Sequence, residues 1–165
     1  MYRNKNESDV RELSKWLRDW LENVKSFNSN IRLFIVANVL IQIGMGVFSV
    51  MYNLYIRELG LPETVNGSVI SVMSLATAIM LVPAGILSDK FGRKWILITG
   101  TSLTAIMLLG RSLVTTEQPI LILGFATGIV WALTQVSGVP FLAENSKPSE
   151  RMQLFSIHFA LVTVA

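Results

Sequence analysis

The residues whose types and spacing could support chemistry are concentrated in one decapeptide, residues 85–94, which lies between two long apolar runs. Gly85 and Gly92 are expected to allow close backbone approach and a tight reversal of the chain. Asp89 is expected to cap the helix that follows and to meet the positive end of its dipole. Arg93 and two lysines add positive charge. The chemistry that this segment predicts is therefore electrostatic rather than catalytic.

Other chemistry finds little support in the sequence. Cysteine is absent, which excludes disulfides and thiolate metal sites, and the single histidine, His158, cannot hold a metal ion alone. The acidic residues all lie outside the long apolar runs, so no Asp–His pair can form at their depth. We therefore expect no enzyme activity, no metal ion, no cofactor and no nucleic-acid partner. The predicted charge interaction is an ion pair between Arg93 and Glu144.

Four long apolar runs must position these residues, and each predicts a membrane-spanning helix. Hydrophobic residues make up 52% of the chain and charged residues 15%, against about 25% charged in ordinary soluble domains. At ~1.5 Å per residue, about 20 apolar residues cross a hydrocarbon core of ~30 Å. The predicted fold class is an all-α, polytopic transmembrane helix bundle over residues 31–165. Its spans are expected at residues 33–55, 65–87, 95–114 and 119–143, with an incomplete span at 152–165.

The first 30 residues are predicted to form a separate element, an amphipathic helix. Apolar residues recur at helical spacing along one face, while charged residues occupy the other. Such a helix suits the surface of the cytoplasmic leaflet, with Trp16 and Trp20 at the level of the lipid headgroups. The alternative is a soluble helix that packs on the protein's own loops or on a partner.

The distribution of lysine and arginine predicts the orientation in the membrane. Of the 14 basic residues, 12 lie in residues 1–32, 88–94 and 144–151, which alternating spans place on one side. Because cytoplasmic loops carry the excess of positive charge, this side is predicted to be cytoplasmic. The expected location is the plasma membrane of a bacterial cell. Arg111, the one charge inside a predicted span, is expected to extend to the outer rim, with a buried functional role as the alternative.

The first predicted span carries polar side chains on one helical face. They are Asn38, Gln42, Ser49 and Asn53. Polar groups at membrane depth must face protein or a water-filled cavity. One interpretation is a stripe that lines a substrate path, and the other is hydrogen bonding between helices, worth about 0.6–2 kcal/mol for each bond. Periodicity alone does not decide between them.

Small residues recur on one face of the second and fourth predicted spans. In the fourth, Gly124 and Gly128 are spaced for close approach of another helix, and Trp131 and Gln135 share their face. These two larger side chains could meet a substrate or pack on a neighbouring helix. In the second span, the small residues that predict close helix approach are Gly67, Ser71, Ser74 and Ala78.

The decapeptide at residues 85–94 resembles the G-x-L-x-D-x-x-G-R-[KR] signature of the major facilitator superfamily, which lies between that family's second and third transmembrane helices. Every defined position matches. The resemblance implies that the first and fourth helices line a central cavity, which favours the substrate-path interpretation of the polar stripe; for Trp131 and Gln135 both interpretations stay open. The residues that the resemblance assigns to conformational gating are Gly85, Asp89, Gly92, Arg93 and Lys94.

The resemblance implies a secondary active transporter that moves a small solute by alternating access, with export as one candidate direction. Complete family members have twelve spans in two halves, so a chain that stops inside its fifth span is expected to be an N-terminal fragment that does not transport alone. Because no ionisable residue lies deep in the predicted spans, neutral or amphipathic solutes are favoured. The alternative function is a non-transporting, membrane-embedded interaction or assembly module.

The expected partners follow from this interpretation. They are the lipid bilayer, an unidentified small solute, the C-terminal half of the transporter, and a second copy of the chain that associates through the cavity face. A proton is the candidate coupling ion. Many members of the family carry an arginine early in the fourth helix, whereas residues 121–124 contain no basic side chain.

Overall fold

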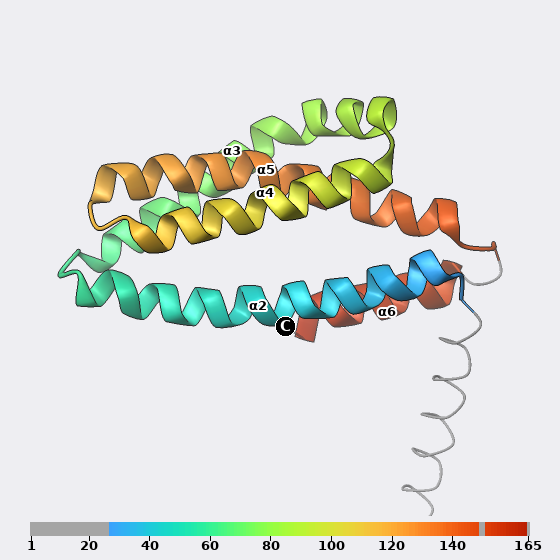
Figure 1. Ribbon diagram of the computed structural model, residues 1–165, viewed down its shortest axis with the longest axis horizontal. Helices are drawn as coiled ribbons and strands as arrows, with labels where there is room; N and C mark the ends of the chain where they lie inside the picture. Colours follow the sequence, from blue (N-terminus) through green and yellow to red (C-terminus); the bar gives the residue numbers. More distant parts are fainter. Residues whose placement is uncertain (1–26, 149–150, 165) are drawn as a thin grey trace, which may run out of the picture.

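The computed structural model describes residues 27–148 and 151–164, and every regular element in this part of the chain is an α-helix (Figure 1). The helices are α2 (Ser29–Glu58), α3 (Glu63–Phe91), α4 (Arg93–Leu113), α5 (Glu117–Asn145) and α6 (Arg151–Val164). The predicted all-α fold class is confirmed. The amphipathic helix predicted for residues 1–30 falls almost entirely on residues 1–26, which lie outside the described residues.

Helices α2 to α5 are long and apolar enough to cross a membrane. Each coincides with one predicted span to within a few residues at either end. Large apolar side chains stand exposed along them, among them Leu40, Val82 and Ile122. Such exposure suits a lipid environment, because lipid tails are as apolar as these side chains. Helix α6 has 14 residues, which are too few to cross a bilayer.

The helices lie in two layers (Figure 1). In one layer, α5 packs along both α3 and α4, which make little contact with each other. In the other layer, α6 lies beside the first half of α2. The layers are joined by fewer contacts than those that hold α3, α4 and α5 together. The bundle is therefore a tight group of three helices with a more loosely attached pair.

The tight packing of α5 on α3 depends on Gly128. A Cβ atom at this position would overlap with the Met73 carbonyl oxygen and lie 2.9 Å from the Ala76 Cβ. The close approach also lets the Thr77 hydroxyl donate a hydrogen bond of 3.0 Å to the Gly128 carbonyl. Farther along the interface, the buried hydroxyls of Ser88 and Ser137 share a hydrogen bond of 2.8 Å.

The small-residue face predicted for the second span does not form this contact. Its four members are all exposed: Gly67, Ser71, Ser74 and Ala78. Helix α3 instead turns Met73 and Ala76 toward α5. The prediction chose the wrong face of α3, because Gly128 meets the Met73 backbone and the small side chain of Ala76 instead.

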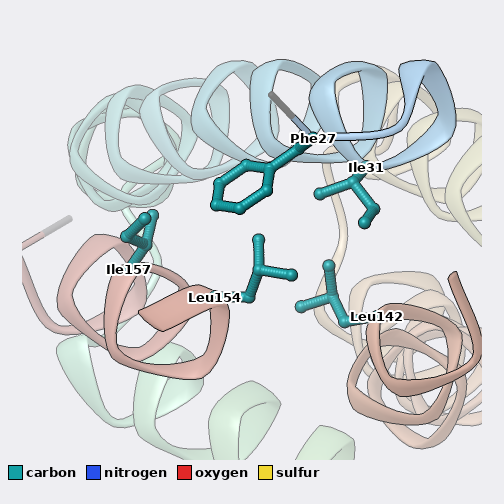
Figure 2. Close-up of a cluster of buried hydrophobic side chains, with 5 residues drawn as sticks. All are labelled: Phe27, Ile31, Leu142, Leu154 and Ile157. Atoms are coloured by element: carbon teal, nitrogen blue, oxygen red, sulfur yellow. The ribbon is translucent and has the colours of Figure 1, made fainter. Parts of the chain in front are cut away.

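Two apolar clusters attach α2 to the rest of the bundle, one near each end. Figure 2 shows the first, in which Phe27, just before α2, and Ile31, at its start, point toward side chains of α5 and α6. Its buried members are Phe27, Ile31, Leu142, Leu154 and Ile157. The second cluster joins the end of α2 to the starts of α3 and α5, and its buried members are Tyr52, Ile56, Val65, Val69 and Ile120. Between Ile31 and Tyr52, α2 has no buried residue.

Candidate functional site

A cavity of about 510 Å³ lies beside the second half of α2, where it is lined by residues of α2, α3, α4 and α5. Most of its lining is apolar, including Met45, Phe48 and Met73. The polar side chains that reach it are Ser49, Tyr52, Asn66, Ser74, Thr77, Arg111, Trp131 and Gln135. Ligand sites for small molecules have volumes of about 300–1,000 Å³ and a similar mixture of apolar walls and a few polar groups.

The structure brings together some of the residues predicted for the substrate path. Ser49 of α2 lies in the cavity lining with Trp131 and Gln135 of α5. Trp131 is half-buried and Gln135 is exposed. Three side chains from two helices therefore face the same space.

The other members of the polar stripe lie outside the lining. The Asn38 Nδ2 atom donates a hydrogen bond of 2.9 Å to His158 Nδ1 on α6. Gln42 is half-buried and Asn53 is exposed. The stripe thus divides along the length of α2, since its first residue bonds to a neighbouring helix and Ser49 faces the cavity. The two parts of the stripe therefore differ in what they contact, and the substrate path stays a prediction.

Arg111 does not extend to the outer rim. Only 5% of the residue is exposed, and the guanidinium carbon lies 4.2 Å from the ring centroid of Tyr52 and 5.6 Å from that of Phe48. The prediction from the sequence was wrong because these two aromatic faces, one helical turn apart on α2, cover the guanidinium and attract it as a cation–π partner. Both Arg111, whose burial was only the alternative prediction, and Tyr52, which was not predicted at all, line the cavity. The available signal was the presence of a charge inside a span.

The signature loop places Arg93 between two carboxylates. Its Nη2 lies 3.0 Å from Asp89 Oδ1, and its Nε lies 3.2 Å from Glu144 Oε1. Glu144 is the acid named from the sequence as its partner. Arg93 therefore connects the end of α3, the start of α4 and the end of α5. Lys94, beside it, is exposed.

Asp89 does not cap α4. Helix α3 continues to Phe91, so Asp89 lies in the last turn of the preceding helix, and the cap position of α4 is Gly92, with no side-chain cap hydrogen bond. Gly92 is the single residue between the two helices and has φ 90°. Gly85 lies inside α3 and takes no part in the reversal. Of the two glycines in the signature, only Gly92 has a positive φ and makes the reversal that was expected of both.

In residues 27–148 and 151–164, no three His, Asp or Glu side chains lie close enough to hold a metal ion. Two charged groups lie at opposite ends of α4. One is Arg111 in the cavity lining, and the other is Arg93 with its two carboxylates.

Comparison with known proteins gives two matches. The family model described as Major Facilitator Superfamily matches residues 34–165. An uncharacterized MFS-type transporter of Methanocaldococcus jannaschii is 26% identical over 130 residues, which cover 77% of this chain and 34% of the relative. The chain therefore spans about a third of the length of the curated relative that it matches. No solved structure matches it.

Proposed function

Because the chain belongs to the major facilitator superfamily, we propose that it forms part of the solute path of a secondary active transporter that works by alternating access. Membership assigns the chain to integral, multi-pass membrane proteins that carry solutes, rather than to enzymes. The observation that carries the proposal is the cavity of about 510 Å³, to which Ser49, Trp131 and Gln135 contribute. An assembly module would leave such a cavity without a role.

The ion pairs of Arg93 suit conformational gating at the signature loop. Glu144 and Asp89 are more than half exposed, so each pair is worth only about 0.2–1 kcal/mol. Pairs of this strength hold three helix ends together and still separate at small cost. In this proposal, the pairs form in one state of the transport cycle and break in another.

The 165-residue chain is proposed to need further protein to transport. Alternating access requires two units that move about a site between them, and the chain spans about a third of the curated relative. Self-association through the cavity face is the proposed behaviour of the chain when it is alone, because polar and small residues promote helix contacts in lipid.

Replacing Trp131 with alanine is expected to lower solute uptake about tenfold, because a buried aromatic contact in a binding pocket contributes ~1.4 kcal/mol or more. Uptake of a solute panel into proteoliposomes is measured for the longest reading frame that contains the chain, with and without a proton gradient to test coupling. The control is Trp95→Ala, at a position that is 67% exposed and outside the cavity lining. Equal effects of the two substitutions would contradict the assignment of the cavity.

The N-terminus and the signature loop are proposed to be cytoplasmic. The native chain has no cysteine, so a Lys90→Cys variant is expected to resist an impermeant thiol reagent in intact cells, whereas Thr64→Cys is labelled; both positions are exposed. Ser88, which is only 3% exposed, is unsuitable for labelling. Labelling of Lys90→Cys together with protection of Thr64→Cys would contradict the proposed orientation.

A further inference from the structure

Two buried polar groups at the cavity have no hydrogen-bond partner. Arg111 and Tyr52 both line the cavity, and each is 5% exposed. In the part of the chain that the structure describes, neither Arg111 Nε nor Tyr52 Oη finds an acceptor or donor. Most buried polar side-chain atoms in proteins are paired, so an unpaired atom indicates a missing partner.

The charge of Arg111 is also unpaired. The three ion pairs among the described residues involve Arg57 and Arg93, not Arg111. The other polar side chains in the lining, such as Ser49 and Gln135, are neutral. The faces of Phe48 and Tyr52 attract the guanidinium, but a ring carries no net charge to neutralise it. The cavity therefore contains one positive charge without a counter-ion.

We infer that Arg111 and Tyr52 form an anion subsite, which binds the carboxylate or phosphate of a small organic solute. The guanidinium offers several N–H donors to such a group, and the Tyr52 hydroxyl offers one more. The apolar lining, with Trp131, takes the body of the solute. This inference rests on the proposed transport function and names its substrate class. It replaces the preference for neutral solutes, which assumed that no charge reaches the cavity.

The test measures binding to the 165-residue chain rather than transport. Three of its four tryptophans, Trp16, Trp20 and Trp95, are replaced with phenylalanine, so that Trp131 reports on the cavity. The monomeric fraction of the protein, in uncharged detergent, is titrated with benzoate and with its neutral analogue benzamide, so that self-association does not cover the cavity. Benzoate is expected to change the fluorescence saturably and to bind at least about tenfold more tightly than benzamide, as a charge-assisted hydrogen bond allows.

Arg111→Gln is expected to weaken benzoate binding about ten- to a hundredfold and to change benzamide binding less than twofold. Arg111→Lys keeps the charge and should retain part of the binding, which shows that the fold is intact. The matched control is Arg57→Gln, which removes the same charge at an exposed position outside the lining and should leave both affinities unchanged. Benzoate binding that survives Arg111→Gln, or equal losses for both probes, would overturn the subsite.

The phosphate of a lipid headgroup could occupy the same subsite. A second experiment distinguishes this lipid anion from the anion of a solute. The titration is repeated in nanodiscs of phosphatidylcholine alone and of phosphatidylcholine mixed with phosphatidylglycerol. Unchanged benzoate affinity supports a solute anion, whereas competition by phosphatidylglycerol that Arg111→Gln abolishes would overturn that assignment. Failure of benzoate to bind, while the longer protein still transports a neutral solute, would sink the subsite and leave the proposed function standing.

Discussion

Replacing Gly128 with alanine is expected to lower the free energy of unfolding by about 1–3 kcal/mol, the usual effect of overpacking. The added methyl group would overlap with the Met73 carbonyl, which belongs to the backbone and cannot rotate away. Helices α3 and α5 would have to separate, which would also stretch the hydrogen bond from Thr77 to the Gly128 carbonyl. The measurement is unfolding by sodium dodecyl sulfate in mixed micelles, followed by circular dichroism.

The matched control is Gly44→Ala on α2, where an added Cβ would have no heavy atom within 4 Å. Because alanine favours a helix over glycine by about 1 kcal/mol, this variant is expected to be as stable as the parent or more so. If the two variants unfold alike, the close approach of α3 and α5 does not determine the stability of the bundle.

Replacing Gly92 with alanine is expected to have the second large effect on stability. Its backbone, at φ 90° and ψ 130°, lies in a region that residues with a side chain rarely adopt, and such strain costs about 1–3 kcal/mol. Relief of the strain would rotate α4 against α3 and draw Arg93 away from Glu144. We expect lower stability in the same unfolding assay and lower uptake by the longer protein.

The matched control is Gly85→Ala. Gly85 is the other glycine that the signature defines, but it lies inside α3, where an added Cβ would have no heavy atom within 4 Å. Gly85→Ala is expected to match the parent chain in stability. A larger loss at Gly85 than at Gly92 would show that the turn is not the strained part of the loop.

The spans could be predicted from the sequence because the constraint on them is local. In hydrocarbon, each backbone N–H and C=O must bond within its own segment, so a run of 20 or more apolar residues becomes a helix almost regardless of its neighbours. The signature loop between two such runs predicted the family, which the match of the family model to residues 34–165 confirmed.

It was harder to predict which neighbour each helix face contacts, because such contacts join residues that are distant in sequence. A stripe along the 30 residues of α2 meets α6 at Asn38 and the cavity at Ser49. Helical periodicity groups these residues on one face but does not say which neighbour that face meets at each turn. The burial of Arg111 likewise depends on two rings from another helix.

The ion pair that Asp89 forms with Arg93 could have been predicted from the sequence. Asp89 and Arg93 are four residues apart, the spacing at which opposite charges meet on a continuous helix, and here they also meet across the turn at Gly92. Because Asp89 was expected to cap the next helix, its ion pair with Arg93 was not predicted. Because α3 continues to Phe91, the break falls at Gly92, and the ion pair bridges it.

The attachment of α2 by clusters near its two ends has a mechanical consequence. A rod that is supported at both ends bends most at its middle, and the middle of α2 contains Gly44 and Gly46, which weaken a helix. Such bending changes the width of the adjoining cavity while both clusters stay intact. Under the proposed transport function, the stiffness of this one helix sets the range of solute sizes that fit the cavity, and Gly44→Ala, harmless to stability, should narrow that range.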